Sequence, residues 1–197
     1  MKKKIIIAYL CSPYVPKKSF DDFIFHYKKY RPGVKHELVI CFKNLSLNEI
    51  SDFKKRIKKI KYKGFIDPEK KNDFDFGTNK RLAKKYRNNL IFFMNGHSYP
   101  LKKNWLKFYN LNYKYKSIVA STASFESISS KSIFRHHMDN YLTYVYKIIK
   151  YFFLFPSFPN PHFRTTNFLI LGSDFLKYDF KTDVDSKEKA WCIESGK

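Results

Sequence analysis

The sequence is poor in residues that cross-link or sharply bend a small fold, with three cysteines and six glycines among 197 residues. Cys11, Cys41 and Cys192 lie far apart and form neither a CxxC pair nor a Cys/His ligand spacing, which argues against a structural zinc site. Cys11 and Cys41 end apolar runs, where a free thiol behaves as a small buried hydrophobic group. This usage fits a reducing compartment, and we expect a cytoplasmic protein.

Long hydrophobic runs are also lacking. Three lysines precede Ile5 near the N-terminus, but the apolar stretch that follows is too short for the core of a signal peptide. The most apolar stretch, 141–155, is shorter than the ~20 residues that span a bilayer, and Lys147 and Lys150 interrupt it. Its Tyr, Phe and Lys content is typical of an interfacial helix on a membrane. A helix packed on the domain or against another copy would show the same pattern.

Acidic residues are scarce, with 17 Asp and Glu against 39 Lys and Arg, giving a formal net charge of +22. The excess is almost all lysine and is spread through nearly every segment, without the basic stripe and aromatic or modular pattern of a nucleic-acid reader. We therefore expect no specific nucleic-acid partner. The charge fits anionic membrane surfaces or phosphorylated substrates, and it fits equally a general compositional preference for lysine.

The residues that are abundant predict a folded domain. The hydrophobic set makes up 44% of the sequence and aromatic residues 19%, and a chain of this length buries enough surface for one core. We therefore treat 1–197 as a single domain. Apolar runs of strand length alternate with segments of helical spacing, which predicts an α/β fold with a mostly parallel sheet.

The expected elements follow this alternation along the chain. Strands are predicted at 4–11, 37–42, 65–66, 90–94, 117–120 and 167–171. Helices are predicted from an N-cap at Ser19 to about Arg31, and at 47–61, 78–86, 101–109 and 186–194. In open α/β sheets ligands bind beyond the carboxyl ends of the strands, so the loops after Cys11, Phe42 and Met94 are the expected site.

Two stretches carry a resemblance to a known family. Residues 72–105 read NDFDFGTNKRLAKKYRNNLIFFMNGHSYPLKKNW, in which Asp75 and Gly77 precede a helix and the next strand ends in Asn95, Gly96, His97 and Ser98. This stretch resembles the centre of family 2-like glycosyltransferases with the GT-A fold. Residues 159–171, PNPHFRTTNFLIL, and the terminal ESGK resemble a branch found in bacterial surface-polysaccharide clusters. The matched segments cover less than half of the chain.

The resemblance implies a fold, a division of the chain and an activity. The fold would be GT-A-like, or Rossmann-like, with a donor-binding part at about 1–124 and an acceptor-side part at about 125–197. Because the family continues beyond the ESGK motif, the acceptor side is expected to be incomplete. The activity would be sugar transfer from a nucleotide-diphosphate donor to a glycan or lipid-linked acceptor, in polysaccharide or lipopolysaccharide synthesis at the inner face of the membrane.

The same resemblance implies the site residues. Donor-binding positions would be Asp75, Gly77, Asn95, Gly96, His97, Ser98 and Arg164. An inverting transfer needs a base for the acceptor hydroxyl, and the candidates are Glu194 and Glu188, although Lys189 stands where the branch tends to have an acidic residue.

Metal dependence is open at this stage, because Asn95-Gly96-His97 replaces the Asp-x-Asp motif that usually follows the strand. Asn95 and His97 could hold Mn²⁺ or Mg²⁺. Backbone N–H groups near Gly96, together with Lys102, could instead bind the diphosphate directly. Two other functions also fit the sequence: a basic non-catalytic module for nucleic acid or anionic membrane, and a catalytically inactive relative of the glycosyltransferases.

Overall fold

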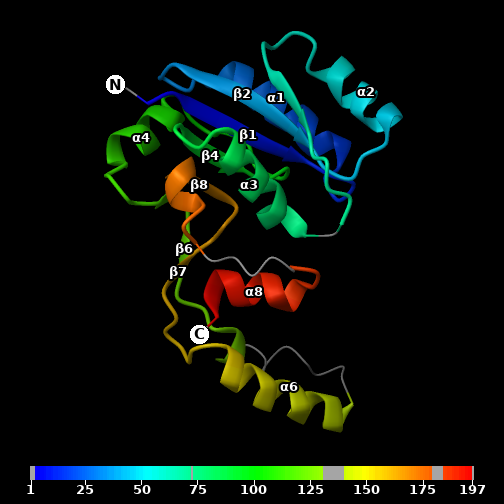
Figure 1. The fold of residues 1–197 in the computed structure, drawn as a ribbon, viewed down its shortest axis with the longest axis vertical. Helices are drawn as coiled ribbons and strands as arrows, with labels where there is room; N and C mark the ends of the chain where they lie inside the picture. The colour runs from blue at the N-terminus through cyan, green and yellow to red at the C-terminus, as the bar shows by residue number, and fades with distance from the viewer. Residues whose placement is uncertain (1–2, 72, 131–139, 179–183, 197) are drawn as a thin grey trace.

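The computed structural model describes residues 3–71, 73–130, 140–178 and 184–196, and it is built around one six-stranded sheet (Figure 1). The strand order is β3-β2-β1-β4-β8-β5. The four strands β1 to β4 are mutually parallel, whereas β8 runs antiparallel to β4, and β5 pairs antiparallel with β8. The predicted α/β class, with a mostly parallel central sheet flanked by helices, is confirmed.

The strands keep close to their predicted positions. They are β1 (Ile5–Cys11), β2 (His36–Phe42), β3 (Lys63–Ile66), β4 (Leu90–Met94), β5 (Val119–Ala120) and β8 (Asn167–Leu171). A separate two-stranded antiparallel ribbon joins β6 (Ala123–Ser124) to β7 (His162–Phe163), which the sequence analysis did not foresee.

Helices cover both faces of the sheet, as a parallel sheet requires. The helices of the described residues are α1 (Lys17–Lys29), α2 (Leu47–Arg56), α3 (Phe74–Lys85), α4 (Trp105–Asn112), α6 (Tyr141–Leu154), α7 (Gly172–Phe175) and α8 (Lys187–Ser195), of which α6 lies away from the sheet (Figure 1). Alternate strand residues point to opposite faces: Ile5 and Ile7 pack with α1, α2 and α4, whereas Ile6 and Ala8 pack with α3 and α7. Each face therefore has its own buried apolar core.

Several predicted helix ends were wrong. Helix α1 begins at Lys17 and not after Ser19, because the Pro16 carbonyl already accepts from the Ser19 backbone N at 3.0 Å. Helix α2 ends at Arg56, five residues before the predicted 61, and a turn carries the chain onward from Ile57, which stays fully buried. The apolar spacing continued past the helix because the turn residues also pack on the core.

The starts of two further helices also differ. Helix α3 begins at Phe74, so Asp75 lies in its first turn and not in the loop before it. Helix α4 begins at Trp105 and not at 101, because Asn104 adopts a left-handed conformation with φ of 61°. An N-cap with this backbone conformation is not signalled by residue pattern.

The second half of the chain extends away from the sheet. Figure 1 shows the β6/β7 ribbon leading downward from the sheet, α8 beside it, and α6 at the end of the molecule opposite α2. The stretch 141–155 is thus a helix, as predicted, over 141–154. Among the described residues, no helix is long and apolar enough to cross a membrane.

Candidate functional site at the carboxyl end of β4

Asn95 to Ser98 form a tight polar turn directly after β4. The Asn95 Oδ1 accepts hydrogen bonds from the His97 backbone N at 3.2 Å and from Ser98 Oγ at 2.6 Å. The Asn95 backbone N donates to the Thr166 carbonyl at 3.0 Å, and Asn167 Nδ2 donates to Ser98 Oγ at 2.9 Å. The Asn95 side chain and contacts with Thr166 and Asn167 at the start of β8 therefore fix the shape of this turn.

Gly96 brings the loop after β4 against the loop after β1. A Cβ added at Gly96 would lie 2.2 Å from Val15 Cγ2 and 2.5 Å from the Leu10 carbonyl oxygen, so no side chain fits there. The buried Tyr9 hydroxyl donates to the Gly96 carbonyl at 2.7 Å. Gly96 thus provides a close approach between two strand ends.

Asp75 reaches the same region from the first turn of α3. It follows Phe74, whose φ of 51° is in the left-handed region and costs an aromatic residue of order 1–3 kcal/mol. Asp75 lines a small pocket together with Asn95, Thr165 and Thr166. The strained residue separates this carboxylate from Asp73, which belongs to a different cluster described below.

Glu194 approaches from α8 and is the second carboxylate of the site. Its Oε1 accepts from the Thr165 backbone N at 2.9 Å and from Thr165 Oγ1 at 3.3 Å. Burial raises the pKa of Asp75, and the nearby charge of Glu194 raises it further, while the Asp75 and Phe76 backbone N–H groups and the charge of Lys43 oppose the rise. Two carboxylates that repel each other therefore lie near a strand end.

An apolar pocket adjoins this carboxylate pair. Thr165 and Glu194 line it together with apolar and aromatic side chains, namely Phe76, Ile118, Phe163, Phe168, Phe175, Tyr178 and Ile193. A polar edge beside an apolar wall is the usual composition of a small-molecule site.

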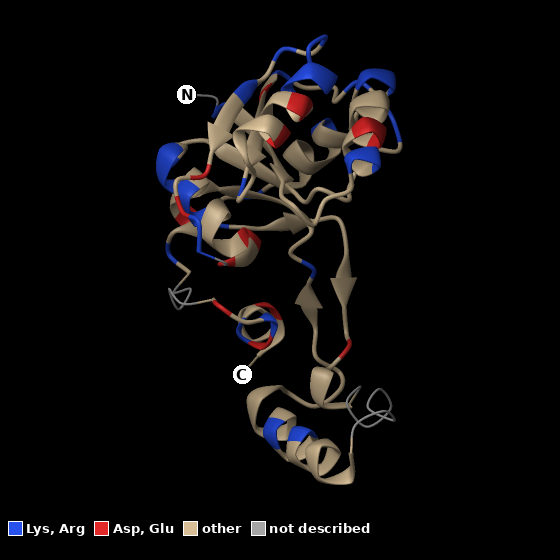
Figure 2. Cartoon of the chain, turned by 90° about the vertical axis from the view of Figure 1, so that its right-hand side faces the viewer, with Lys and Arg blue, Asp and Glu red and all other residues tan. Residues whose placement is uncertain are grey.

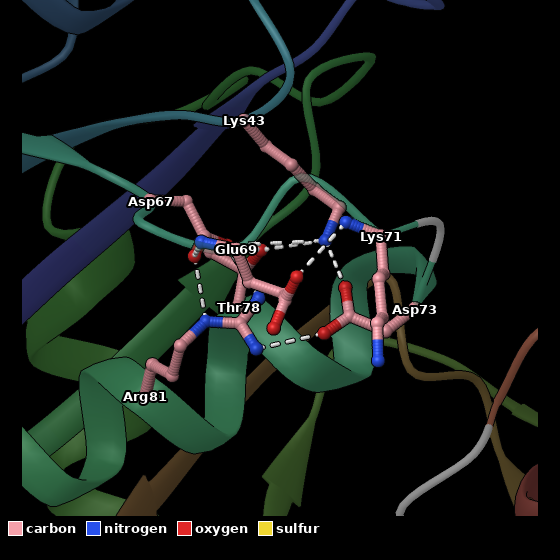
Figure 3. Close-up of polar contacts among 7 residues, drawn as sticks. All are labelled: Lys43, Asp67, Glu69, Lys71, Asp73, Thr78 and Arg81. Atoms are coloured by element: carbon pink, nitrogen blue, oxygen red, sulfur yellow. Dashed lines mark hydrogen bonds and ion pairs between the residues drawn. The ribbon is translucent and has the colours of Figure 1, made fainter.

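A buried ionic cluster anchors α3 next to the site (Figure 3). Lys43 and Asp67 directly follow β2 and β3, and Asp73, Thr78 and Arg81 belong to the N-cap and body of α3. Arg81 donates from Nε and Nη2 to the two oxygens of Asp67, both at 2.6 Å, and from Nη1 to Asp73 at 2.7 Å. Lys43 Nζ pairs with Asp73 and donates to Thr78 Oγ1 at 3.3 Å. We call these five residues the Lys43 cluster.

The Lys43 cluster pairs two cations with two carboxylates and buries one member of each kind almost completely. The side chains of Lys43 and Asp67 are 5% and 0% exposed, and they lie 3.8 Å apart. Burial acts to raise the pKa of Asp73, but hydrogen bonds from Arg81 and Lys43 outweigh it and lower that pKa. Gly77 is part of this arrangement, since a Cβ added there would lie 1.7 Å from Asp73 Oδ2.

Three of the predicted site residues lie apart from the pocket or point outward. Glu188 forms an ion pair with Lys150 of α6 at 2.8 Å, and it is about 120° from Glu194 around α8. Arg164 forms an exposed ion pair with Glu126 at 3.0 Å. His97 is exposed, with its backbone N bonded to Asn95.

The polar atoms of the turn after β4 do not suit a cation held by Asn95 and His97. A hard divalent cation prefers several oxygen ligands, but the Asn95 Oδ1 already accepts two hydrogen bonds that shape the turn. Among the residues that the structure describes, no group of three or more His, Cys, Asp or Glu is placed to hold a metal ion.

Sequence reasoning missed several residues next to this site. Lys43 could have been found, because the loop after Phe42 was one of the three expected ligand positions. Thr165 lay inside the matched segment 159–171 without being singled out. Asp67, Thr78 and Arg81 carry no local pattern that connects them, since only the folded sheet edge brings them together.

Comparisons with known proteins give a distant likeness. No family model and no curated protein matches the chain. Among solved structures, the X-ray structure of the mannosyltransferase Ktr4p from S. cerevisiae matches at 11% identity with a TM-score of 0.47, covering 98% of this chain and 62% of that one. The same mannosyltransferase in complex with GDP matches at 11% identity and a TM-score of 0.47, covering 98% and 63%. The chain thus spans less than two thirds of the length of these solved chains.

Proposed function

We propose that the chain binds a nucleotide-diphosphate sugar beside β4 and transfers the sugar to a hydroxyl of a glycan or lipid-linked acceptor. The observation that carries the proposal is that Asp75 and Asn95 line one small pocket at the carboxyl edge of the sheet, and that Glu194 accepts a hydrogen bond from Thr165 of the same pocket. This edge is where α/β sheets bind ligands. The sequence resemblance to family 2-like glycosyltransferases supports the reaction class.

Each residue has a distinct role in this proposal. Asn95, Gly96, His97 and Ser98 form the donor side, and Asp75 contacts the nucleotide sugar. Glu194 is the general base: its carboxylate takes the proton of the acceptor hydroxyl as the oxygen bonds to the anomeric carbon and the nucleotide diphosphate leaves. Glu194 is preferred to Glu188 because Glu194 lines the pocket, whereas Glu188 is paired with Lys150.

The cellular setting belongs to the proposal as well. A transferase of this kind would act in surface-polysaccharide or lipopolysaccharide synthesis, in the cytoplasm or on the inner face of the membrane. The acceptor side would lie around 125–197, next to the apolar pocket that contains Glu194.

Donor binding is tested by thermal unfolding with UDP, GDP and dTDP, each with and without Mn²⁺. We expect at least one nucleotide to raise the melting temperature of the wild type. Asn95→Ala should remove this rise, because the turn after β4 loses the side chain that shapes it. If no nucleotide stabilises the wild type, the proposal fails.

Catalysis is tested by comparing Glu194→Gln with Glu188→Gln, two identical changes on the same helix. Loss of a general base lowers the transfer rate by about 10²- to 10⁴-fold, so Glu194→Gln should bind nucleotide normally but lose transfer. Glu188→Gln should retain both. The reverse pattern would assign the base to Glu188, and binding without transfer in the wild type would indicate an inactive relative.

A further inference from the structure

Helix α6 exposes a row of large apolar side chains. Six large apolar residues of this helix are 54% to 80% exposed: Tyr141, Leu142, Tyr146, Ile149, Phe152 and Phe153. At 100° per residue they fall within an arc of about 140° around the helix axis. We call them the α6 arc. No charged residue falls inside it.

The opposite side of α6 holds the helix on the rest of the molecule. Tyr151 is buried there, and Phe155, which follows the helix, is 1% exposed. Lys150, just beyond the edge of the arc next to Tyr146, forms the ion pair with Glu188 of α8. Apolar residues therefore occupy most of the helix circumference: one side packs on the molecule through Tyr151, whereas the α6 arc on the other side faces outward.

Such an exposed stripe marks an interaction surface, because soluble proteins rarely expose contiguous apolar patches of this kind. The helix has 14 residues, a length of about 21 Å, which is too short to cross the ~30 Å hydrocarbon core of a bilayer. A helix of this length can lie in the plane of the interface. Figures 1 and 2 show α6 at the far end of the molecule, where a flat surface can reach it.

The composition of the α6 arc and the charge of the chain favour an anionic lipid bilayer as the partner. Tyr and Phe, which make up four of the six residues in the α6 arc, suit the boundary between headgroups and acyl chains. Helix α6 has two lysines and no carboxylate, and the whole chain carries +22. This charge attracts an anionic bilayer and opposes the approach of a second copy of the same chain.

We propose that the α6 arc is a membrane-docking surface that inserts into the interface of an anionic lipid bilayer, with α6 parallel to the membrane plane. The surface is independent of the donor site at β4. Docking therefore does not rest on the transferase proposal, and either can fail without the other.

The test is co-sedimentation of the chain with phosphatidylcholine vesicles, with and without phosphatidylglycerol. The wild type should bind the mixed vesicles and bind pure phosphatidylcholine more weakly. The triple variant Leu142→Ser, Ile149→Ser, Phe153→Ser should reduce binding to the mixed vesicles by about tenfold or more, because it removes apolar area that the bilayer would bury.

A matched control makes three comparable changes on exposed apolar residues elsewhere. Leu47, Phe108 and Leu111 are 80%, 58% and 71% exposed, and their replacement by Ser should leave vesicle binding unchanged. Circular dichroism and nucleotide-dependent melting of both variants show whether the fold and the donor site are intact.

Three results would overturn docking through α6. The first is a wild type that does not sediment with anionic vesicles. The second is binding that survives the triple variant on the α6 arc, which would assign it to surface lysines. The third is a wild-type dimer in sedimentation velocity that this variant converts to monomer while vesicle binding is absent, since the arc would then bind a second copy.

Discussion

Asp75 is held in an environment that disfavours its charge. Burial is the largest cause of its raised pKa, and repulsion from Glu194 raises the pKa further. Backbone N–H groups of its own turn stabilise the ionised carboxylate and oppose this rise. The neighbouring Phe74 has a strained backbone at φ of 51°. Unfavourable charge and strain that coincide at one helix start are typical of sites retained for function.

Replacing Asp75 by Asn should stabilise the protein at neutral pH. A raised folded pKa means that the ionised carboxylate opposes folding above that pKa, and this cost disappears as pH falls below the unfolded value of about 3.9. The unfolding free energy of Asp75→Asn should therefore exceed that of the wild type at pH 7, with the gap closing in acid. Urea titrations across this range measure the difference, and an equal or less stable variant at pH 7 would contradict it.

At the scale of elements, α3 is positioned by ion pairs between side chains and not only by apolar packing. Its first turns carry Asp73, Thr78 and Arg81, which meet Lys43 after β2 and Asp67 after β3 (Figure 3). The cluster fixes where the helix starts relative to the sheet edge. Because Asp75 lies in the same first turn, the position of this proposed donor-site carboxylate depends on the Lys43 cluster.

Lys43→Met should be strongly destabilising. Removing one partner of a buried ion pair leaves an uncompensated charge, and we expect a loss of about 3 kcal/mol at neutral pH. Since the pKa of Asp73 is lowered in the fold, this pair stabilises the protein above the unfolded pKa of about 3.9 and stops doing so as pH falls through the folded value. The difference in unfolding free energy between the wild type and Lys43→Met should therefore shrink in acid. Urea unfolding at several pH values measures this difference.

Lys63 provides the control for this prediction. It pairs with Glu37 at 2.9 Å, but its side chain is 63% exposed. Lys63→Met should therefore have a much smaller effect, because exposed ion pairs contribute little. Equal losses for the two variants would show that Lys43 does not act through a buried pair.

At the scale of the whole molecule, positive charge covers the part built on the sheet. Figure 2 shows Lys and Arg over many helices and loops of that part, whereas the described residues at the end that carries α6 are mostly uncharged, with two lysines on the helix itself. The two ends of the molecule therefore present different surfaces: a cationic one around the sheet and an apolar one on the α6 arc.

A net charge of +22 should make stability depend on salt. Lysines that repel each other across the surface destabilise the compact state, and salt screens them over a Debye length of about 8 Å at physiological ionic strength. The melting temperature should therefore rise as sodium chloride is added from a low-salt buffer. A fall would show that attractive ion pairs outweigh the general repulsion.

The sequence by itself determined the fold class and the strand positions, because the alternation of apolar strands and amphipathic helices is a local pattern. It also determined that Asn95 to Ser98 follow a buried strand, at the sheet edge where α/β proteins generally bind ligands. Helix starts at Lys17, Phe74 and Trp105 were missed, since local proline geometry and left-handed backbone conformations at Phe74 and Asn104 decide them.

Only the tertiary structure decided which polar groups meet. Glu194 and Glu188 were both candidate bases in the sequence, with Glu194 inside the ESGK segment, but only the packing of α8 turns the first toward Thr165 and pairs the second with Lys150. The Lys43 cluster unites residues that follow β2 and β3 with residues of α3 and its N-cap, and their contacts exist only at the folded sheet edge. Likewise, the apolar content of α6 was visible in the sequence, but only its contacts in the fold show that the apolar side faces outward.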